Sequence, residues 1–426
     1  MDQNVLLKYG KGKVKADLEG LKLTGTVTSK EVKKIENIQE EINFVLENPV
    51  NSPPFSEIFT KDDKVLIVIS DITRGWINYP SFLPIVVNKL NTLGVPDENI
   101  TFLTATGTHR KQSDEEKRLL VGENIFKRFE IIDHDCATQK MIPIGKTSFN
   151  NEVYVNGLTR GRKVILTGGI TPHLMAGFGG GRKSAIPGIS SYETIQRNHL
   201  LALDPNAPRS NPLIGLGSVE SNPLNQDMKE ACELLNPEFL INVTINDEGN
   251  LAGIFAGHWY DAWFKGTQWI KENYFVPIQS KSDIIIASCG GYPKDINLYQ
   301  ACKTLFNAVN GLKSGGSLVF LAECSEGAGA DSFFNYLTPF KEGRLDEALR
   351  EAFTIPGYIF YAAIEAAKMA DVYLVSKMDP KDIKTMGFIP CSDIDTAMKL
   401  VKEKHKNNID TLILPYGGST VPVPPK

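Results

Sequence analysis

Residues 163–199 read KVILTGGITPHLMAGFGGGRKSAIPGISSYETIQRNH, and this stretch decides both the expected fold and the expected site. Its first residues, Lys163–Thr167, are typical of a strand. A glycine-rich loop follows, and glycine allows positive φ angles and a close approach of the backbone to a ligand. Successive N–H groups in such a loop form a nest for an anion, and the adjacent Arg182 and Lys183 add positive charge. The loop residues that we expect around a bound phosphate are Gly179, Gly180, Gly181, Arg182, Lys183 and Ser184.

The spacing of this loop excludes two common nucleotide motifs. A P-loop requires the last glycine to precede the lysine directly, and here Arg182 lies between them. Arg182 also occupies the position of the last glycine in the dinucleotide-binding fingerprint. A glycine run before Arg-Lys is often only a turn or a solvated loop. The preceding strand and two flanking histidines, His173 and His199, favour a bound anionic ligand.

Strand and helix patterns alternate along the chain and predict an α/β fold with doubly wound, mainly parallel sheets. Glu31–Asn48 carries a helical pattern, and Ser113 with Glu116 forms a capping box at the start of another helix. The expected strands are runs of apolar and β-branched residues. They cover 64–70, 100–106, 130–133, 163–167, 283–289, 316–322, 371–376 and 410–415.

A chain of 426 residues exceeds the usual size of a single core, so we expect two domains. The first is expected to cover 1–279, and the second 280–409. The tail 410–426 ends in TVPVPPK, whose prolines restrict it to a sheet edge or a loose end, and it is left open to return to the first domain.

The composition is that of an ordinary soluble protein and limits the classes of partner. The net charge is −4 without a basic tail, which argues against nucleic acid. No apolar run is long enough for a membrane span, and the first residues lack the apolar core of a secretion signal. The six cysteines are scattered without a Cys-x-x-Cys pair, as in reduced cytoplasmic proteins. We therefore expect a cytoplasmic protein with a small-molecule ligand.

Four polar clusters each follow an expected strand. They are Asp71 to Arg74, Thr106 to Arg110, Gly168 to His173, and the Gly290-Gly291 pair that leads into a helix with Tyr299, Gln300 and Lys303. Ligands of open α/β sheets bind at the carboxyl ends of strands. Three of the clusters belong to one expected sheet and the fourth to the second domain, so we expect an active site in the crevice between the domains.

Each of these residues alone also has an ordinary structural explanation. Asp71, Thr73 and Arg74 can be a helix cap beside a surface arginine, and a single histidine is more often structural than catalytic. His134 lies between two aspartates and could bind a metal, but a loop histidine is the better interpretation. His258 and His405 have no supporting context. The joint placement at strand ends favours function, although it does not name a reaction.

At these residues the chain resembles the nickel-pincer lactate racemase family of 2-hydroxyacid racemases and epimerases. The resemblance runs along nearly the whole chain. It is strongest in SDITR (70–74), ATGTHR (105–110), PHLMAGFGGGRKSAIPGISSYETI (172–195), NH (198–199) and GGYPKDINLYQACK (290–303). The long glycine-Arg-Lys segment is its most specific part.

The resemblance implies a cofactor and a set of residue roles. The cofactor is a pyridinium-3-thioamide-5-thiocarboxylate mononucleotide that holds nickel and is covalently linked to Lys183, with His199 as the protein ligand of the metal. Cofactor-building and nickel-inserting enzymes are then required partners. His109 and His173 would act as paired acid and base while hydride moves to and from the pyridinium ring. Arg74 and Lys303 would hold the substrate carboxylate, with Asp71, Tyr299 and Gln300 around the pocket.

One departure from the family concerns the substrate. Lactate-specific members carry a tryptophan shortly after an Ile-Pro pair, whereas here Ile355-Pro356 is followed by Tyr358 and Phe360. Lactate is the leading substrate, and malate, an aryl-lactate or a sugar acid are the alternatives. A protein that only binds a nucleotide or phosphate is a further alternative. Such a binder needs the glycine loop but has no use for His109, His173 and Lys303 together.

Overall fold

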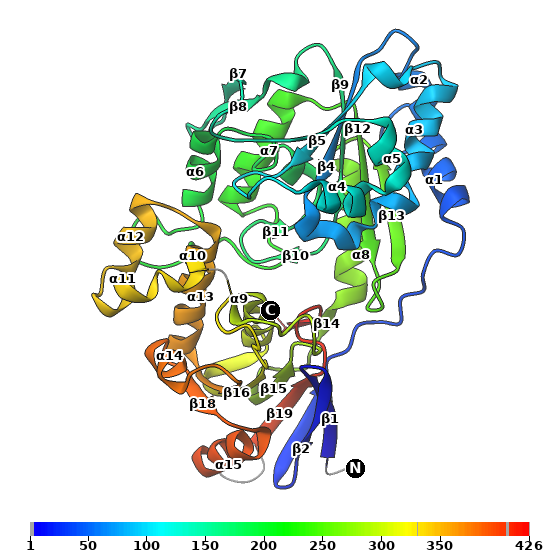
Figure 1. Ribbon diagram of the computed structural model, residues 1–426. Coiled ribbons are helices and arrows are strands. Elements are labelled where there is room, and N and C mark those ends of the chain that lie inside the picture. Colours follow the sequence, from blue (N-terminus) through cyan, green and yellow to red (C-terminus); the bar gives the residue numbers. More distant parts are fainter. Residues whose placement is uncertain (1–3, 330, 406–408, 426) are drawn as a thin grey trace. The chain divides into compact units, whose positions relative to one another are not determined.

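The computed structural model describes residues 4–329, 331–405 and 409–425, which form two compact units (Figure 1). Unit 1 is composed of Met1–Glu31, Asn206–Ser210 and Glu272–Lys426. Unit 2 is composed of Val32–Pro205 and Asn211–Lys271. Each unit has its own six-stranded sheet combined with helices, so the predicted two-domain α/β fold with mainly parallel sheets is confirmed.

The sheet of unit 2 has the strand order β13-β12-β9-β4-β5-β6, in which β12 and β13 are antiparallel and the other pairs are parallel. Residues 65–69 of the central strand β4 are fully buried, because side chains cover both faces of a central parallel strand. The strands are β4 (Val65–Ser70), β5 (Ile100–Ala105), β6 (Ile131–Asp133), β9 (Lys163–Gly169), β12 (Phe239–Ile245) and β13 (Leu251–Gly257).

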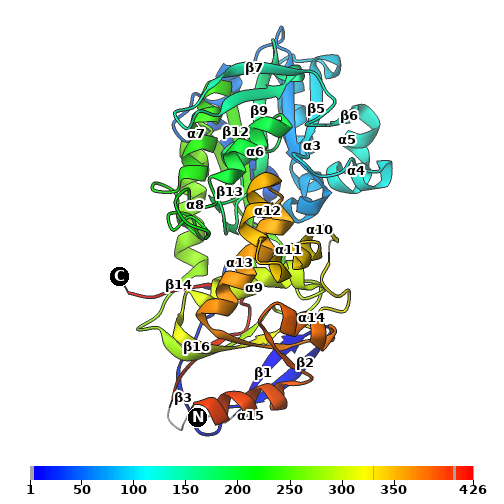
Figure 2. The same ribbon diagram turned by 90° about the vertical axis from the view of Figure 1, so that its left-hand side faces the viewer.

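Helices cover this sheet on both sides (Figures 1 and 2). On one face, buried side chains of four helices pack against Val65, Ile67 and Ile69 of β4. These helices are α1 (Ile38–Glu47), α3 (Leu83–Thr92), α4 (Asp114–Val121) and α5 (Glu123–Arg128). Helices α6 and α7 lie on the other side. The remaining elements of unit 2 are α2 (Phe55–Ile58), α6 (Tyr192–Leu200), α7 (Pro223–Leu235), α8 (Asp261–Tyr274, which extends into unit 1), and the hairpins β7–β8 (Met141–Lys146, Glu152–Asn156) and β10–β11 (Pro172–His173, Gly177–Phe178).

The sheet of unit 1 is parallel throughout, with the order β18-β17-β16-β15-β19-β3. The hairpin β1–β2 and helix α15 pack on one face, and α9 and α13 contact the strands from the other. The strands are β1 (Asn4–Tyr9), β2 (Gly12–Asp17), β3 (Leu21–Thr26), β15 (Ser282–Ser288), β16 (Leu312–Leu321), β17 (Asp371–Val375), β18 (Ile389–Cys391) and β19 (Ile409–Leu414). The helices are α9 (Leu298–Val309), α10 (Asp331–Phe334), α11 (Leu337–Lys341), α12 (Leu345–Glu351), α13 (Ile355–Met369), α14 (Pro380–Thr385) and α15 (Ile394–Lys404).

The division of the chain differs from the expected ranges at both ends. Strand β3 pairs with β19, so residues 1–31 lie in unit 1 and not in the N-terminal domain where the sequence placed them. The tail also stays in unit 1, where β20 (Val421–Val423) pairs with β14 (Phe275–Pro277). Pairing between segments this far apart leaves no local signal in the sequence.

The helical pattern over 31–48 produces a helix only from Ile38 onward. The side chain of Asn37 accepts the N–H of Glu40 and thereby caps the helix at this point. The capping box of Ser113 and Glu116 is present as expected. All six cysteines are free thiols, and Cys136 is the least buried of them. None of the described helices has the length and apolar character that a bilayer crossing requires.

Candidate active site

The polar clusters of unit 2 meet at the point where the strand order of its sheet reverses. The chain moves outward from β4 to β5 and β6, and later from β9 to β12 and β13 on the other side. Strands β4 and β9 are neighbours, and their carboxyl ends lead into Asp71 and into Gly168–His173. A buried tyrosine joins the two ends, because the Tyr79 hydroxyl accepts from Ser70 N–H at 2.8 Å and from the Thr167 hydroxyl at 2.9 Å. Such a reversal point is the usual ligand site of an open α/β sheet.

Asp71 orients His109 at this edge. The carboxylate is only 4 % exposed, and its Oδ2 is hydrogen-bonded to Nδ1 of His109. Its Oδ1 accepts from the Thr73 hydroxyl at 2.5 Å. Burial alone would raise the pKa of Asp71, but the bond from His109, the charges of His109 and Arg74, and the Thr73 hydroxyl together hold it below its ordinary value. The carboxylate therefore accepts the Nδ1 proton, which leaves Nε2 of His109 as the nitrogen that can exchange a proton.

His173 and Lys183 form a second pair, with 2.8 Å between Nε2 and Nζ. Nδ1 of His173 accepts the backbone N–H groups of Met175 and Ala176, both at 3.2 Å. Because Nδ1 is an acceptor, the proton of the neutral ring lies on Nε2 and is donated to the lysine nitrogen. Lys183 must then present a lone pair, which requires an uncharged amine.

The electrostatics of the pair agree with this protonation. Burial, and after it the positive charges of Arg74 and Arg182, hold the pKa of Lys183 well below its ordinary value. Burial, together with the positive charges of Arg74 and Arg182, also holds the pKa of His173 well below its ordinary value. The structure thus combines a neutral, nucleophilic amine with a neutral imidazole at the end of the glycine loop.

His199 lies in the last turn of α6 and is 3 % exposed. Its Nδ1 is 2.9 Å from the carbonyl oxygen of Ile195, and because a carbonyl only accepts, Nδ1 carries the proton. Nε2 is then the nitrogen with the lone pair, as a metal ligand requires. Burial lowers the pKa of His199 to about 4, against a smaller raising effect of its bond to Ile195. The imidazole is therefore neutral across the physiological range.

The donor set tests whether a nickel cofactor fits this site. Over residues 4–329, 331–405 and 409–425, no group of three or more His, Cys, Asp or Glu side chains could hold a metal ion. A metal held at His199 would need further ligands from a bound molecule or from water. The neutral Lys183 amine is suited to attach such a molecule covalently, so the residues present fit a metal that arrives inside an organic cofactor.

The glycine loop packs closely against the protein. A Cβ on Gly181, whose φ is +57°, would lie 2.6 Å from the Trp263 ring, and one on Gly180 would lie 2.5 Å from Oδ1 of Asn242. The same Asn242 oxygen accepts the Gly181 N–H at 2.7 Å. Glycine is therefore required at 180 and 181 by neighbouring side chains, in addition to any ligand.

The structure gives Arg182 and Ser184 a different role from the predicted phosphate contact. Arg182 is 0 % exposed, stacks on Trp263 at 4.0 Å, and donates to Asn225 and to the carbonyl oxygens of Phe178, Gly180 and Ala176. No carboxylate among the described residues pairs with it. Ser184 donates to the Thr167 carbonyl at 2.8 Å. Both side chains hold the loop in shape, because burial turns their polar groups toward backbone acceptors.

The remaining predicted residues lie on α9 of unit 1. Asn297 caps this helix by accepting the N–H of Gln300 at 3.0 Å, and Lys303 Nζ donates to Gln300 Oε1 at 2.9 Å. The Tyr299 ring lies 5.8 Å from Phe333. The interdomain crevice that would bring α9 to the residues of unit 2 stays a prediction.

Tyr358 and Phe360, which follow Ile355-Pro356 where lactate-specific members carry a tryptophan, belong to the core of unit 1. Tyr358 is 1 % exposed and donates to the Ser210 hydroxyl at 3.0 Å. Phe360 is 0 % exposed and packs edge-on against Phe333 at 5.4 Å, the same ring that contacts Tyr299. Phe333 therefore connects Phe360 with the predicted substrate-binding helix.

His134 is a structural residue, as the sequence favoured. Its Nε2 is 2.9 Å from the Ser190 carbonyl and its Nδ1 accepts from Asn156 at 3.1 Å, so both ring nitrogens are used by the protein. Burial lowers its pKa, against a smaller raising effect of the Ser190 bond and Asp135. The ring is neutral and ties the end of β6 to Ser190, two residues before α6.

We expect this neutral histidine to make the protein less stable in acid. Its folded pKa lies below the unfolded value of about 6.5, so below that pH the unfolded state binds a proton that the native state refuses. The stability that the neutral His134 contributes is complete above about pH 6.5. As the pH decreases below that value, this contribution falls by up to about 1.4 kcal/mol per pH unit. Urea unfolding at pH 7.5 and pH 5.5 should show a smaller drop for His134→Gln than for the unchanged protein. Equal drops would contradict this assignment.

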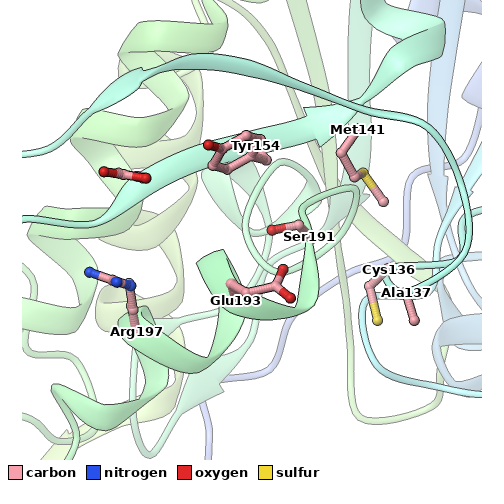
Figure 3. Close-up of a pocket in the computed structure, with 8 residues that line it drawn as sticks. Cys136, Ala137, Met141, Tyr154, Ser191, Glu193 and Arg197 are labelled. Atoms are coloured by element: carbon pink, nitrogen blue, oxygen red, sulfur yellow. The ribbon is translucent and has the colours of Figure 1, made fainter.

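A pocket of about 390 Å³ lies beside α6 and contains none of the residues with a predicted role (Figure 3). Glu193 and Arg197 extend from the helix, and Ser191 lies at its start. The other lining residues are Cys136, Ala137, Met141, Glu152 and Tyr154. The candidate site is thus distinct from this hollow.

Sequence reasoning missed the residues that support the loop from behind. Asn225 on α7, Asn242 on β12 and Trp263 on α8 all bond to the glycine-rich segment. The Asn222-Pro223 pair marks the start of α7 by a capping asparagine and a first-turn proline. The polar residues that follow resemble a solvated helix face, although they are buried.

Comparison with known proteins identifies the family. A model described as the lactate racemase N-terminal domain matches residues 9–210, and the lactate racemase C-terminal domain matches residues 278–422. The lactate racemase of Lactiplantibacillus plantarum is 30 % identical over 96 % of this chain and 97 % of that protein. The lactate racemase of Thermoanaerobacterium thermosaccharolyticum is 29 % identical over 98 % of this chain and 99 % of its own length.

The fold agrees with the sequence matches. The structure of the lactate racemase apoprotein from Thermoanaerobacterium thermosaccharolyticum superimposes with a TM-score of 0.87 at 27 % identity, covering 98 % of this chain and 99 % of that one. Both domain models and a relative at 30 % identity thus extend across the two units. The chain belongs to the lactate racemase family.

Proposed function

We propose that the protein is an isomerase that interconverts the two enantiomers of lactate, using a nickel-bearing pyridinium mononucleotide linked covalently to Lys183. The observation that carries the proposal is the His173–Lys183 contact. A buried lysine with a lone pair, 2.8 Å from an imidazole nitrogen, is poised for covalent attachment and not for an ion pair. Cofactor-building and nickel-inserting enzymes are the partners that the proposal requires.

His199 is proposed to hold the nickel through Nε2. The Ile195 carbonyl fixes its tautomer, and burial keeps the ring neutral, as a metal-binding imidazole must be. Imidazole suits nickel among the protein ligands. The bound cofactor would supply a pyridinium ring, which is a hydride acceptor suited to the hydrogen at C2 of the substrate.

Two histidines are proposed to handle the proton of the substrate hydroxyl. His109 exchanges it at Nε2, because Asp71 holds Nδ1, and His173 also exchanges it at Nε2, because two backbone N–H groups occupy its Nδ1. The product has the opposite configuration, so the base of one direction is the acid of the other. This requirement explains why one histidine is not enough.

The substrate carboxylate is assigned to Arg74 and Lys303. Nη1 of Arg74 donates to the hydroxyl of the preceding Thr73 at 3.0 Å. The Arg74 guanidinium can bind a carboxylate with two parallel hydrogen bonds. Tyr299 and Gln300 are assigned to the pocket on the resemblance alone. Malate, an aryl-lactate and a sugar acid are the other 2-hydroxyacids to compare, because the chain has no tryptophan near Tyr358 and Phe360, where lactate-specific members carry one.

The proposal excludes a protein that merely binds a nucleotide. Such a binder has no use for a carboxylate-held His109 beside the loop. The test is to produce the protein together with cofactor-building enzymes and supply one enantiomer of lactate, malate, phenyllactate or a sugar acid in turn. Formation of the other lactate enantiomer by cofactor-loaded protein supports the proposal, and an adduct-bearing protein that inverts none of these acids contradicts it.

The six cysteines are all free thiols, which agrees with a cytoplasmic location.

A further inference from the structure

The N-cap and the first turns of helix α7 carry three buried polar side chains. Asn222, Asn225 and Asp227 are each 0 % exposed. Asn222 donates to the Met175 carbonyl at 2.7 Å, two residues after His173, and Asn225 accepts from Arg182 at 2.7 Å, next to Lys183. One helix thus contacts both segments that carry the acid/base histidine and the cofactor lysine.

Asp227 is the third of these side chains and contacts the segment of His199. Its Oδ2 accepts from Nδ2 of Asn198 at 2.8 Å and from Nδ2 of Asn151 at 2.9 Å, and its Oδ1 accepts from the Thr147 hydroxyl at 2.6 Å. No cation among the described residues pairs with this carboxylate. Burying an acid without a cation is unfavourable unless several donors satisfy it, so the three bonds fix the carboxylate tightly.

Asn198 connects the fixed Asp227 carboxylate with the proposed metal ligand His199. It precedes His199 in α6, and its Nδ2 bridges Asp227 and the Leu224 carbonyl, which lies 3.0 Å away on α7. The last turn of α6 is thereby bonded twice to α7. The orientation of His199 then depends on α7 as well as on its own bond to Ile195.

We propose that α7 positions His199 for the metal through Asp227 and Asn198, which are positioning residues and do not touch the metal themselves. This inference rests on the proposed function, because it takes His199 as the nickel ligand. Outer-shell groups that orient a ligating histidine affect metal affinity by about 10- to 100-fold when removed. A loss of nickel without a loss of the organic adduct is the specific sign of such a role.

The chain offers a closely matched control in Asn151. Asn151 and Asn198 each donate from Nδ2 to the same Asp227 oxygen and to one backbone carbonyl, of Thr194 and Leu224 respectively. Both are buried, and the Oδ1 atom of each lacks a hydrogen-bond partner within the described structure. Replacing either one removes the same number of bonds and leaves Asp227 with one donor fewer. The difference is that Asn198 adjoins His199.

The experiment compares Asn198→Ala with Asn151→Ala in protein co-produced with the cofactor-building enzymes. Intact mass gives the adduct, metal analysis gives nickel per adduct, and thermal unfolding gives Tm. We expect similar drops in Tm and similar adduct levels, but at least a tenfold lower nickel affinity for Asn198→Ala alone, measured by chelator competition. If the alanine variants do not accumulate, Asn198→Ser and Asn151→Ser are compared in the same way.

Two results would overturn the inference. One is an unchanged nickel affinity in both variants, and the other is an equal loss of nickel affinity in both, which would make the network merely stabilising. Different observations would refute the proposed function. An unchanged protein without an adduct would refute the cofactor, and His199→Ala with full nickel would refute the ligand assignment. These outcomes are measured on the unchanged protein and on the His199→Ala variant, so they are distinguishable from the result for Asn198→Ala.

Discussion

Lys183→Ala is expected to yield a protein with no covalent adduct and no racemase activity. The Lys183 nitrogen carries a lone pair, because His173 donates its Nε2 proton to it across 2.8 Å. Burial and the neighbouring arginine charges also hold the pKa of this amine well below its ordinary value, which favours the unprotonated, nucleophilic form. Alanine removes the nitrogen at the one place in the loop where an amine has these properties. Intact-mass spectrometry of co-produced protein measures the adduct directly.

Lys303→Ala is the control for this experiment. It removes a lysine that is assigned to the substrate, so it should weaken turnover while the adduct mass remains. A full adduct mass in the Lys183→Ala protein would contradict the assignment of the attachment site. Loss of the adduct in both variants would point to a general defect in loading.

His109→Ala and His173→Ala are each expected to lower kcat/KM for racemisation in both directions by about 10²- to 10⁴-fold, the usual contribution of a positioned acid or base. The two rings differ in what fixes them, a buried carboxylate for His109 and two backbone N–H groups for His173. Both arrangements leave Nε2 to exchange the proton. Because one direction takes a proton where the other gives it back, loss of either ring affects both.

His258→Ala is the matched histidine control in the same unit. Its ring pairs with Asp261 at 2.9 Å and is 42 % exposed, away from the strand ends of the candidate site. We expect turnover close to that of the unchanged protein. Rates should be measured from each lactate enantiomer separately. The equilibrium between the enantiomers fixes the ratio of the two kcat/KM values, so a variant at His109 or His173 must lower both by the same factor. Undiminished rates in either variant would remove that histidine from the mechanism.

The sequence predicts well those features that are local. The buried run of β4 and the polar residues directly after it fall in one window, so the strand end and Asp71 are recognised together. The capping box of α4 is another local pattern. His109 and His173 follow expected strands directly, whereas the roles of Lys183 and His199 are implied by the family resemblance. The structure brings His173 and Lys183 into contact and pairs His109 with Asp71.

The features that sequence reasoning missed depend on burial and on distant partners. Arg182 resembles a phosphate ligand by its place in the loop, yet its environment is a ring and backbone oxygens. Asp227 and Asn225 resemble an exposed helix face, because a sequence pattern does not reveal which polar groups find buried partners. Strand β3 pairs with β19, and the paired residues Leu21 and Ile409 are almost four hundred positions apart in the chain. No window of sequence contains that pairing.

The most direct test of the account follows the hydrogen at C2. The histidines are assigned to the hydroxyl proton, and neither is assigned to the C–H bond, whose proton is far too weakly acidic for an imidazole. Under the proposed function, the hydrogen at C2 would leave and return as hydride, for which a bound pyridinium ring would be the acceptor. We predict that L-lactate deuterated at C2, racemised in ordinary water, gives D-lactate that keeps most of its deuterium at C2. Washout of deuterium into solvent as fast as racemisation would contradict the hydride route and the roles of both histidines.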